Sequence, residues 1–130
     1  LLPVVFPLVM ALAAAAGVAG VPLPFVETGI AASAIALGVL IALAAKPPLW
    51  AAATLVGAFA VFHGHAHGTE LPAAGDPFAY AAGFVIATGL LHAAGIVLGF
   101  ATALPRGALA VRGGGGVIAL LGVGFLTGAV

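Results

Sequence analysis

Apolar residues fill long, almost unbroken stretches of this chain, and the few polar residues lie between them. Each stretch is about 20 residues long, which is the length an α-helix needs to cross the roughly 30 Å hydrocarbon core of a bilayer. The stretches lack the alternation of polar and apolar residues that marks the strands of a membrane β-barrel. The pattern therefore predicts an all-α fold, a polytopic transmembrane helix bundle, as a single membrane domain over residues 1–130. The five expected spans are about Leu1–Val18, Val26–Ala45, Leu49–His67, Phe78–Leu104 and Gly113–Val130.

Composition excludes several other classes of protein. Hydrophobic residues make up 65% of the chain and charged residues 5%, whereas a soluble domain carries about 25% charged residues. Nucleic acid is not an expected partner, because three basic residues cannot follow a phosphate backbone. Cysteine is absent, which excludes disulfides, thiolate metal sites and cysteine nucleophiles. Any metal ion that this chain handles must therefore accept nitrogen and oxygen ligands.

The charged residues divide into two groups along the chain. The basic residues follow the second and fourth expected spans: Lys46, Arg106 and Arg112. The acidic residues follow the first and third expected spans: Glu27, Glu70 and Asp76. Because successive spans alternate in direction, the two groups are expected on opposite faces of the membrane. The positive-inside rule then places the basic group on the cytoplasmic side and the acidic group outside.

Glycine and proline predict packing faces and helix ends. Gly95 and Gly99, and Gly124 and Gly128, have the four-residue spacing that lets helices pack closely, within the chain or between copies in an oligomer. The run at 113–116 is interpreted as a flexible turn before the last span. Asp76 directly precedes a proline, which suits a helix N-cap followed by a first helical turn.

Three of the four histidines lie in one nine-residue segment, 62–70, with the sequence FHGHAHGTE. A helix turns by about 100° per residue, so His63, His67 and Glu70 share a face if the helix continues through the following glycine. Two imidazoles four residues apart can chelate one metal ion, and a carboxylate one turn later can complete or support the site. His65 points about 160° away from His63. It is expected at the membrane surface or facing another helix, and it stays a secondary candidate ligand.

Two further polar residues extend the candidate site. A histidine inside a membrane helix is costly and usually marks a pathway, a relay or a binding site. His92 lies near the middle of the fourth span, with Thr88 one turn earlier on the same face. It is either a hydrogen-bonded structural residue or a deeper coordination or proton-relay position. Glu27 either stabilises the helix dipole of the second span or supplies an acidic group at the outer mouth of the same pathway.

Three functions remain open from the residues alone. In a permease for divalent transition metals, outside cations meet Glu27 and Glu70, lose water to His63 and His67, and move inward past His92. Imidazole and carboxylate suit nickel, cobalt or zinc, and do not suit copper(I).

The two alternatives come from other classes of protein. In an intramembrane hydrolase, three histidines would hold zinc and activate water. However, no His-Glu-x-x-His motif is present, and the acidic residues lie at one rim. In a haem-binding or proton-relay subunit, His63 or His67 would face His92 across two helices. We expect a transporter and not an enzyme.

The histidine segment resembles the signature of the HupE/UreJ family of nickel and cobalt permeases. The segments at 26–33 (VETGIAAS) and 91–95 (LHAAG) are also similar to that family, and the likeness extends along essentially the whole chain. By resemblance, the residues expected to handle the metal are His63, His67, Glu70 and His92, followed by His65 and Glu27.

The resemblance also implies a setting for the protein. Members of this family have six membrane helices after a signal peptide, accompany hydrogenase or urease gene clusters, and take up nickel without ATP. The implied location is the bacterial inner membrane. The metal is then cargo, Ni²⁺ or Co²⁺ with Zn²⁺ possible, and no prosthetic group is expected. The family's His-Pro-x-x-Gly-x-Asp-His motif is not found here, so the chain is expected to begin in the family's second helix.

Overall fold

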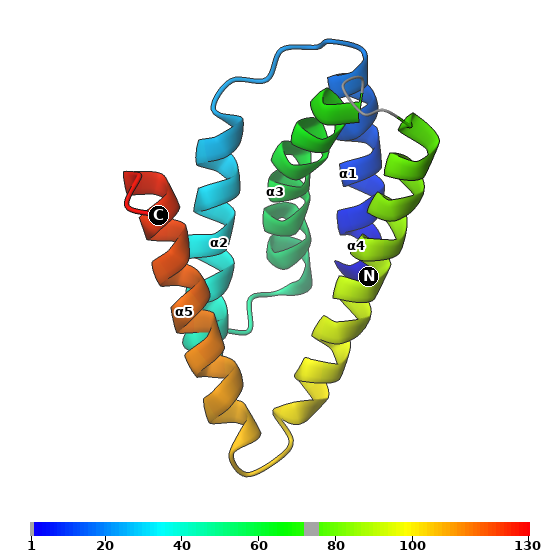
Figure 1. Cartoon of the computed structure of the whole chain (residues 1–130). Helices are drawn as coiled ribbons and strands as arrows, with labels where there is room; N and C mark the ends of the chain where they lie inside the picture. Colours follow the sequence, from blue (N-terminus) through cyan, green and yellow to red (C-terminus); the bar gives the residue numbers. More distant parts are fainter. Residues whose placement is uncertain (1, 72–75) are drawn as a thin grey trace. The chain divides into compact units, whose positions relative to one another are not determined.

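The structure is a computed structural model that describes residues 2–71 and 76–130. Five α-helices follow one another in this part of the chain (Figure 1), and the expected all-α fold is confirmed. They are α1 (Leu2–Val18), α2 (Val26–Ala42), α3 (Leu49–Glu70), α4 (Pro77–Ala101) and α5 (Gly107–Thr127).

The lengths of the helices suit a membrane protein. The segments Leu49–Glu70, Phe78–Ala101 and Gly107–Thr127 are long and apolar enough to cross a bilayer. Helices α1 and α2 are apolar and have 17 residues each. At 1.5 Å per residue each is about 26 Å long, which is near the lower limit for a span.

Helices α2 and α4 end three residues before the expected spans do, and the ends of α3 and α5 change how two sequence features are interpreted. Helix α3 continues past His67 to Glu70, so the whole histidine segment is helical. Helix α5 begins at Gly107, and the run at 113–116 lies inside it. The interpretation of that run as a flexible turn is therefore wrong. For Gly115 the physical reason is packing, because a Cβ there would lie 2.7 Å from Cβ of Ile41, whereas a Cβ at the other three glycines of the run would meet nothing within 4 Å.

The chain forms two compact units. The first unit contains residues 1–27 and 48–92, and therefore α1, α3 and most of α4. The second unit contains residues 28–47 and 93–130, and therefore nearly all of α2, the end of α4 and α5. All four histidines belong to the first unit.

In the first unit, glycines bring α3 into direct contact with the backbone of α1. A Cβ added at Gly64 would collide with the carbonyl oxygen of Met10, and one at Gly68 with that of Ala14. The residue numbers of these contacts rise together along both helices, so α1 and α3 run in the same direction (Figure 1). Gly17 of α1 is also tight, because its Cβ would lie 2.6 Å from the carbonyl oxygen of His65. Small residues at four-residue spacing thus allow the two backbones to touch.

In the second unit, glycines do the same between α2 and α5. A Cβ at Gly38 would lie 2.7 Å from the carbonyl oxygen of Gly115, and one at Gly122 would lie 3.0 Å from that of Ala31. Here the numbers rise along one helix as they fall along the other, so α2 and α5 are antiparallel. Nε of Arg112 donates a hydrogen bond of 2.8 Å to the carbonyl oxygen of Ala42, at the last residue of α2.

The glycine pairs expected to pack closely are not the ones that do so within the described residues. A Cβ at Gly95 or Gly99 would meet nothing within 4 Å, and one at Gly124 would meet only Val130 of its own terminus. Gly128 has a φ of 70° and forms the left-handed C-cap of α5. In a chain with 20 glycines, spacing alone does not identify the face that meets a neighbour. Packing of these faces against another copy stays a prediction.

Helix α4 begins as the sequence predicts. Oδ1 of Asp76 accepts hydrogen bonds of 3.0 Å from the backbone N–H groups of Phe78 and Ala79, which makes Asp76 the N-cap. Most side chains of α4 are exposed. Its half-buried residues in the first unit recur every four positions, on one helix face: Tyr80, Phe84, Thr88 and His92.

We predict that Gly64→Ala destabilises the protein by about 1–3 kcal/mol, because the new methyl group must push α3 away from α1. The matched control is Gly89→Ala in α4, where a Cβ would meet nothing within 4 Å. That variant should be neutral or stabilising by up to about 1 kcal/mol, since alanine favours a helix more than glycine does. Unfolding of the purified protein in detergent measures both changes. Equal effects of the two variants would show that the α1–α3 contact is not tight.

Candidate functional site

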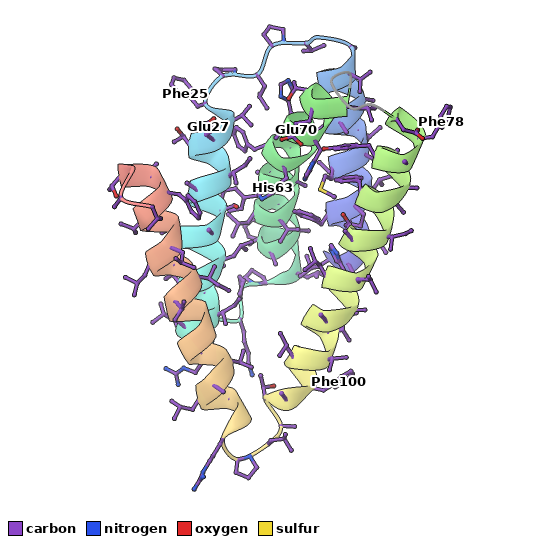
Figure 2. The ribbon with its side chains drawn as sticks, viewed as in Figure 1. Phe25, Glu27, His63, Glu70, Phe78 and Phe100 are labelled. Atoms are coloured by element: carbon purple, nitrogen blue, oxygen red, sulfur yellow. The ribbon has the colours of Figure 1, made fainter. Side chains whose placement is uncertain are left out.

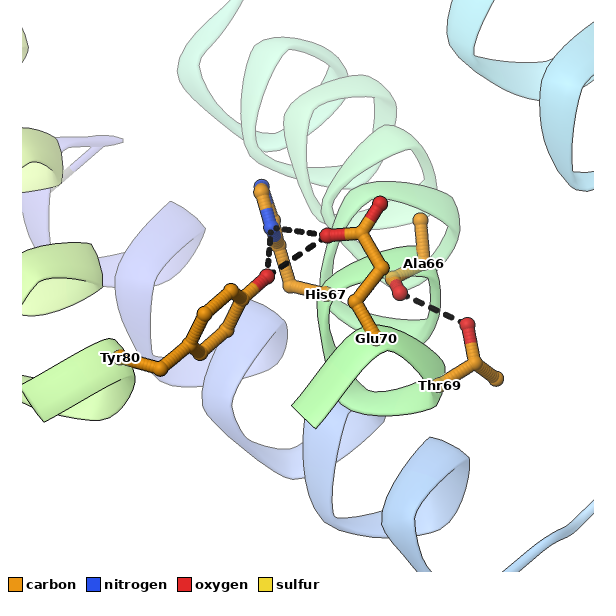
Figure 3. A network of polar contacts seen from close by, with 5 residues as sticks. All are labelled: Ala66, His67, Thr69, Glu70 and Tyr80. Atoms are coloured by element: carbon orange, nitrogen blue, oxygen red, sulfur yellow. Dashed lines mark hydrogen bonds and ion pairs between the residues drawn. The ribbon is translucent and has the colours of Figure 1, made fainter. Parts of the chain in front are cut away.

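One polar network joins the end of α3 to the beginning of α4 (Figure 3). The hydroxyl of Tyr80 donates a 2.6 Å hydrogen bond to Oε2 of Glu70. Nδ1 of His67 lies 3.0 Å from the Tyr80 hydroxyl oxygen and 3.4 Å from Oε2 of Glu70. Since the phenolic proton is given to Glu70, the Tyr80 oxygen accepts the N–H of His67. His67 and Glu70 are thus brought together as predicted, with Tyr80 between them.

Motif and spacing arguments do not point to Tyr80, although the sequence contains a signal for it. Helix α3 ends at Glu70 and α4 begins at Pro77, so the connection is short. A short connection makes consecutive helices antiparallel neighbours. The last turn of α3 therefore lies beside the first turn of α4. That turn contains Tyr80, which is the chain's single tyrosine.

A pocket of about 460 Å³ opens beside this network. His67 supplies the wall from α3, and the ring of Phe84 lies 4.8 Å from the imidazole, centroid to centroid. The remaining lining residues all come from α4: Ala79, Tyr80, Gly83, Ala87, Thr88 and Leu91. The pocket is therefore largely apolar, and its polar side chains are His67, Tyr80 and Thr88.

His63 and His92 share one hydrogen-bond pattern. Nδ1 of His63 lies 2.9 Å from the carbonyl oxygen of Phe59, and Nδ1 of His92 lies 2.8 Å from that of Thr88. A carbonyl oxygen can only accept, so in both rings Nδ1 carries the proton and donates. In the neutral ring, Nε2 then holds a free lone pair, which is the electron pair that binds a metal ion.

Phe6 of α1 contacts both of these histidines. Its ring centroid is 5.9 Å from that of His63 in an edge-on arrangement, and 5.5 Å from that of His92. One aromatic side chain is therefore in contact with a histidine of α3 and a histidine of α4. His63 lies two turns below Glu70 in α3 (Figure 2).

His65 takes a different place from the other histidines. It is buried, at 7% exposure, and Nε2 donates a 2.7 Å hydrogen bond to the carbonyl oxygen of Val21, just beyond α1. Nδ1 is buried and has no hydrogen-bond partner among the described residues. As predicted, the side chain points away from His67 and faces another part of the bundle. This geometry favours a structural tie between α3 and the end of α1.

The candidate residues do not converge on one point. Over residues 2–71 and 76–130, no three histidine, aspartate or glutamate side chains are grouped so that they could hold one metal ion. The expectation that His63, His67 and Glu70 share one ion is therefore not met. His63 turns toward Phe6, while His67 and Glu70 turn toward Tyr80. Glu27 is exposed in the first turn of α2 (Figure 2), where it also suits the helix dipole.

Comparison with known proteins identifies the family. The HupE / UreJ protein family matches residues 1–125. The chain belongs to the HupE/UreJ family. This is a transporter family, associated with nickel and cobalt. The chain is 42% identical over 128 residues to Protein HupE of Rhizobium leguminosarum bv. viciae, which covers 98% of this chain and 67% of that protein. No solved structure matches the chain significantly.

We predict that His65→Ala lowers the free energy of unfolding by about 1–3 kcal/mol, because it removes the hydrogen bond to Val21 and a buried ring. His63→Ala is the matched control on the same helix, since the hydrogen bond of that ring stays within α3. It should cost less stability. Thermal unfolding of both variants in detergent checks the difference. A larger shift for His63→Ala would contradict the structural role of His65.

Proposed function

We propose that this chain forms the greater part of a permease for divalent transition-metal ions, Ni²⁺ or Co²⁺, in the bacterial inner membrane. The observation that carries the proposal is the common tautomer of His63 and His92. Both rings donate Nδ1–H to a carbonyl oxygen, so both keep Nε2 free in a bundle that is otherwise almost entirely apolar. Membership of the HupE/UreJ family supports transport as the activity.

The donor set supports this class of ion. Imidazole nitrogen binds nickel, cobalt and zinc well, and the absence of cysteine together with a single methionine disfavours copper(I). Metal-binding histidines usually donate their other ring N–H to a carbonyl or carboxylate, which fixes the ring and its tautomer. His63 and His92 already have this arrangement. The ion is a substrate, so its sites must be strong enough to select it and weak enough to release it.

The proposed path begins at the acidic end of α3. Glu70 and His67 lie there, His63 is about 10 Å further along α3, and His92 is about 18 Å along α4 from Tyr80. The contacts of Phe6 with His63 and His92 make these two rings neighbouring positions on the path. The ion would enter at this end of α3 and pass to His67, then to His63 and His92.

The setting of the path follows from charge and family. We propose that Glu27, Glu70 and Asp76 face outside and that Lys46, Arg106 and Arg112 face the cytoplasm, by the positive-inside rule. The lipid bilayer is the surrounding partner, and copies of the protein can meet through the glycine faces of Gly95 and Gly124. We propose that the delivered metal serves hydrogenase or urease maturation, and that no prosthetic group takes part. His65 and Glu27 are the least central of the six metal-handling candidates.

The test is uptake of ⁶³Ni²⁺ or ⁵⁷Co²⁺ by cells that express the complete protein. We predict that His63→Ala and His92→Ala each lower the initial uptake rate at limiting metal by about tenfold or more, because each removes a ligand nitrogen. The matched control is Thr54→Val on α3. Thr54 also donates to the carbonyl oxygen one turn earlier, at 2.9 Å from Trp50, but has no ligand nitrogen. Unchanged uptake in both histidine variants, at equal protein levels in the membrane, would disprove the proposal.

A further inference from the structure

We propose that Tyr80 is a positioning residue that connects Glu70 to His67, so that Glu70 acts on the metal ion through the tyrosine hydroxyl and not as a ligand. The proposal rests on the proposed function, since His67 is taken as a residue that binds the transported ion. It assigns a role to a residue outside the histidine segment. It also changes the role of Glu70 from a ligand to a group that orients one.

The hydrogen bonds show which group donates and which accepts at each step of this network. The phenol of Tyr80 has one proton, and it is donated over 2.6 Å to a carboxylate oxygen of Glu70. The same phenol oxygen therefore accepts the Nδ1–H of His67 over 3.0 Å. The direct separation of His67 Nδ1 from the carboxylate is longer, at 3.4 Å. The Tyr80 hydroxyl is thus the nearer partner of both groups (Figure 3).

His67 departs from the pattern of the other two candidate ligands. His63 and His92 each donate Nδ1–H to a carbonyl oxygen four residues earlier in their own helix. His67 instead reaches from α3 to α4. Its hydrogen-bond chain passes through the Tyr80 hydroxyl and ends on the carboxylate of Glu70, whereas the chains of the other two rings end on a neutral carbonyl oxygen. His67 is therefore the one ring of these three whose hydrogen-bond chain ends on a charged group.

The surroundings allow His67 to meet an ion without moving Glu70. His67 and Tyr80 both line the 460 Å³ pocket, whereas Glu70 does not. Tyr80 donates one hydrogen bond to Oε2 of Glu70 and accepts another from His67. The second hydrogen bond fixes the proton of His67 on Nδ1. Nε2 of His67 is then the free nitrogen, as in His63 and His92. All three rings present the same nitrogen for coordination.

The first test reads the tautomer directly and needs no metal. In the complete protein, labelled with ¹⁵N-histidine in nanodiscs at a pH where the rings are neutral, the ¹⁵N shifts identify the protonated nitrogen of His67. We expect protonated Nδ1 in the wild type. In Tyr80→Phe, which keeps the ring and removes only the hydroxyl, a substantial fraction should change to protonated Nε2. Protonated Nε2 in the wild type, or no change in Tyr80→Phe, would overturn the proposal.

The second test measures Co²⁺ affinity from the visible spectrum of the bound ion in the same preparations. Tyr80→Phe and Glu70→Gln should each weaken binding by about 10- to 100-fold. The double variant should bind Co²⁺ no more weakly than the weaker-binding single variant, because both changes break the same hydrogen-bond chain. If the loss of Co²⁺ affinity in the double variant equals the product of the two single losses, Glu70 is an independent ligand and the proposal is overturned.

A matched control and the wild type separate the possible failures. Phe78→Tyr adds a hydroxyl two residues from Tyr80 on a side chain that is 88% exposed (Figure 2), and it should change neither tautomer nor affinity. If wild-type protein binds Co²⁺ and Tyr80→Phe binds it equally well, the role of Tyr80 is wrong and the proposed function stands. If the wild type itself neither binds nor transports Co²⁺ or Ni²⁺, the proposed function fails and the role of Tyr80 fails with it.

Discussion

The backbone contact between α3 and α1 at Gly64 and Gly68 determines where every histidine of α3 points. With about 100° between successive residues, a helix whose glycine face is fixed against a neighbour has no rotational freedom left. His65 falls on one side of the contact, and His63 and His67 fall on the other. The glycines and histidines of this segment are therefore one structural unit, in which the glycines set the rotation and the histidines receive their partners.

Those partners explain how so apolar a bundle tolerates four imidazoles. A polar group that is removed from water must be hydrogen-bonded, because otherwise nothing compensates for the free energy of hydration that it loses. His63 and His92 use carbonyl oxygens of their own helices, His65 uses the backbone beyond α1, and His67 uses Tyr80. Each ring thus has one nitrogen occupied by a protein oxygen. What distinguishes the rings is which nitrogen that is, and His65 is the exception because it donates through Nε2.

The sequence was sufficient for features that depend on local pattern. Five helices, the Asp76 cap and the opposite direction of His65 all follow from apolar length, capping chemistry and helical periodicity. Local sequence patterns do not predict features that depend on contacts between helices. Glycine spacing occurs at several places in the chain, and only the structure shows that Gly64 and Gly115 lie at interfaces. Tyr80 could be found only by combining the length of the α3–α4 connection with the rotation of both helices.

Under the proposed function, the shared position of the proton on His63 and His92 would affect the speed of ion transfer. A ring that carries its proton on Nε2 must exchange it for one on Nδ1 before it can bind a cation through Nε2, and the protons for that exchange are scarce in hydrocarbon. Carbonyl oxygens that hold the proton on Nδ1 would remove this step from each passage of an ion. A cation that moves along the proposed path would then change only its own ligands, while the protons of the protein stay where they are.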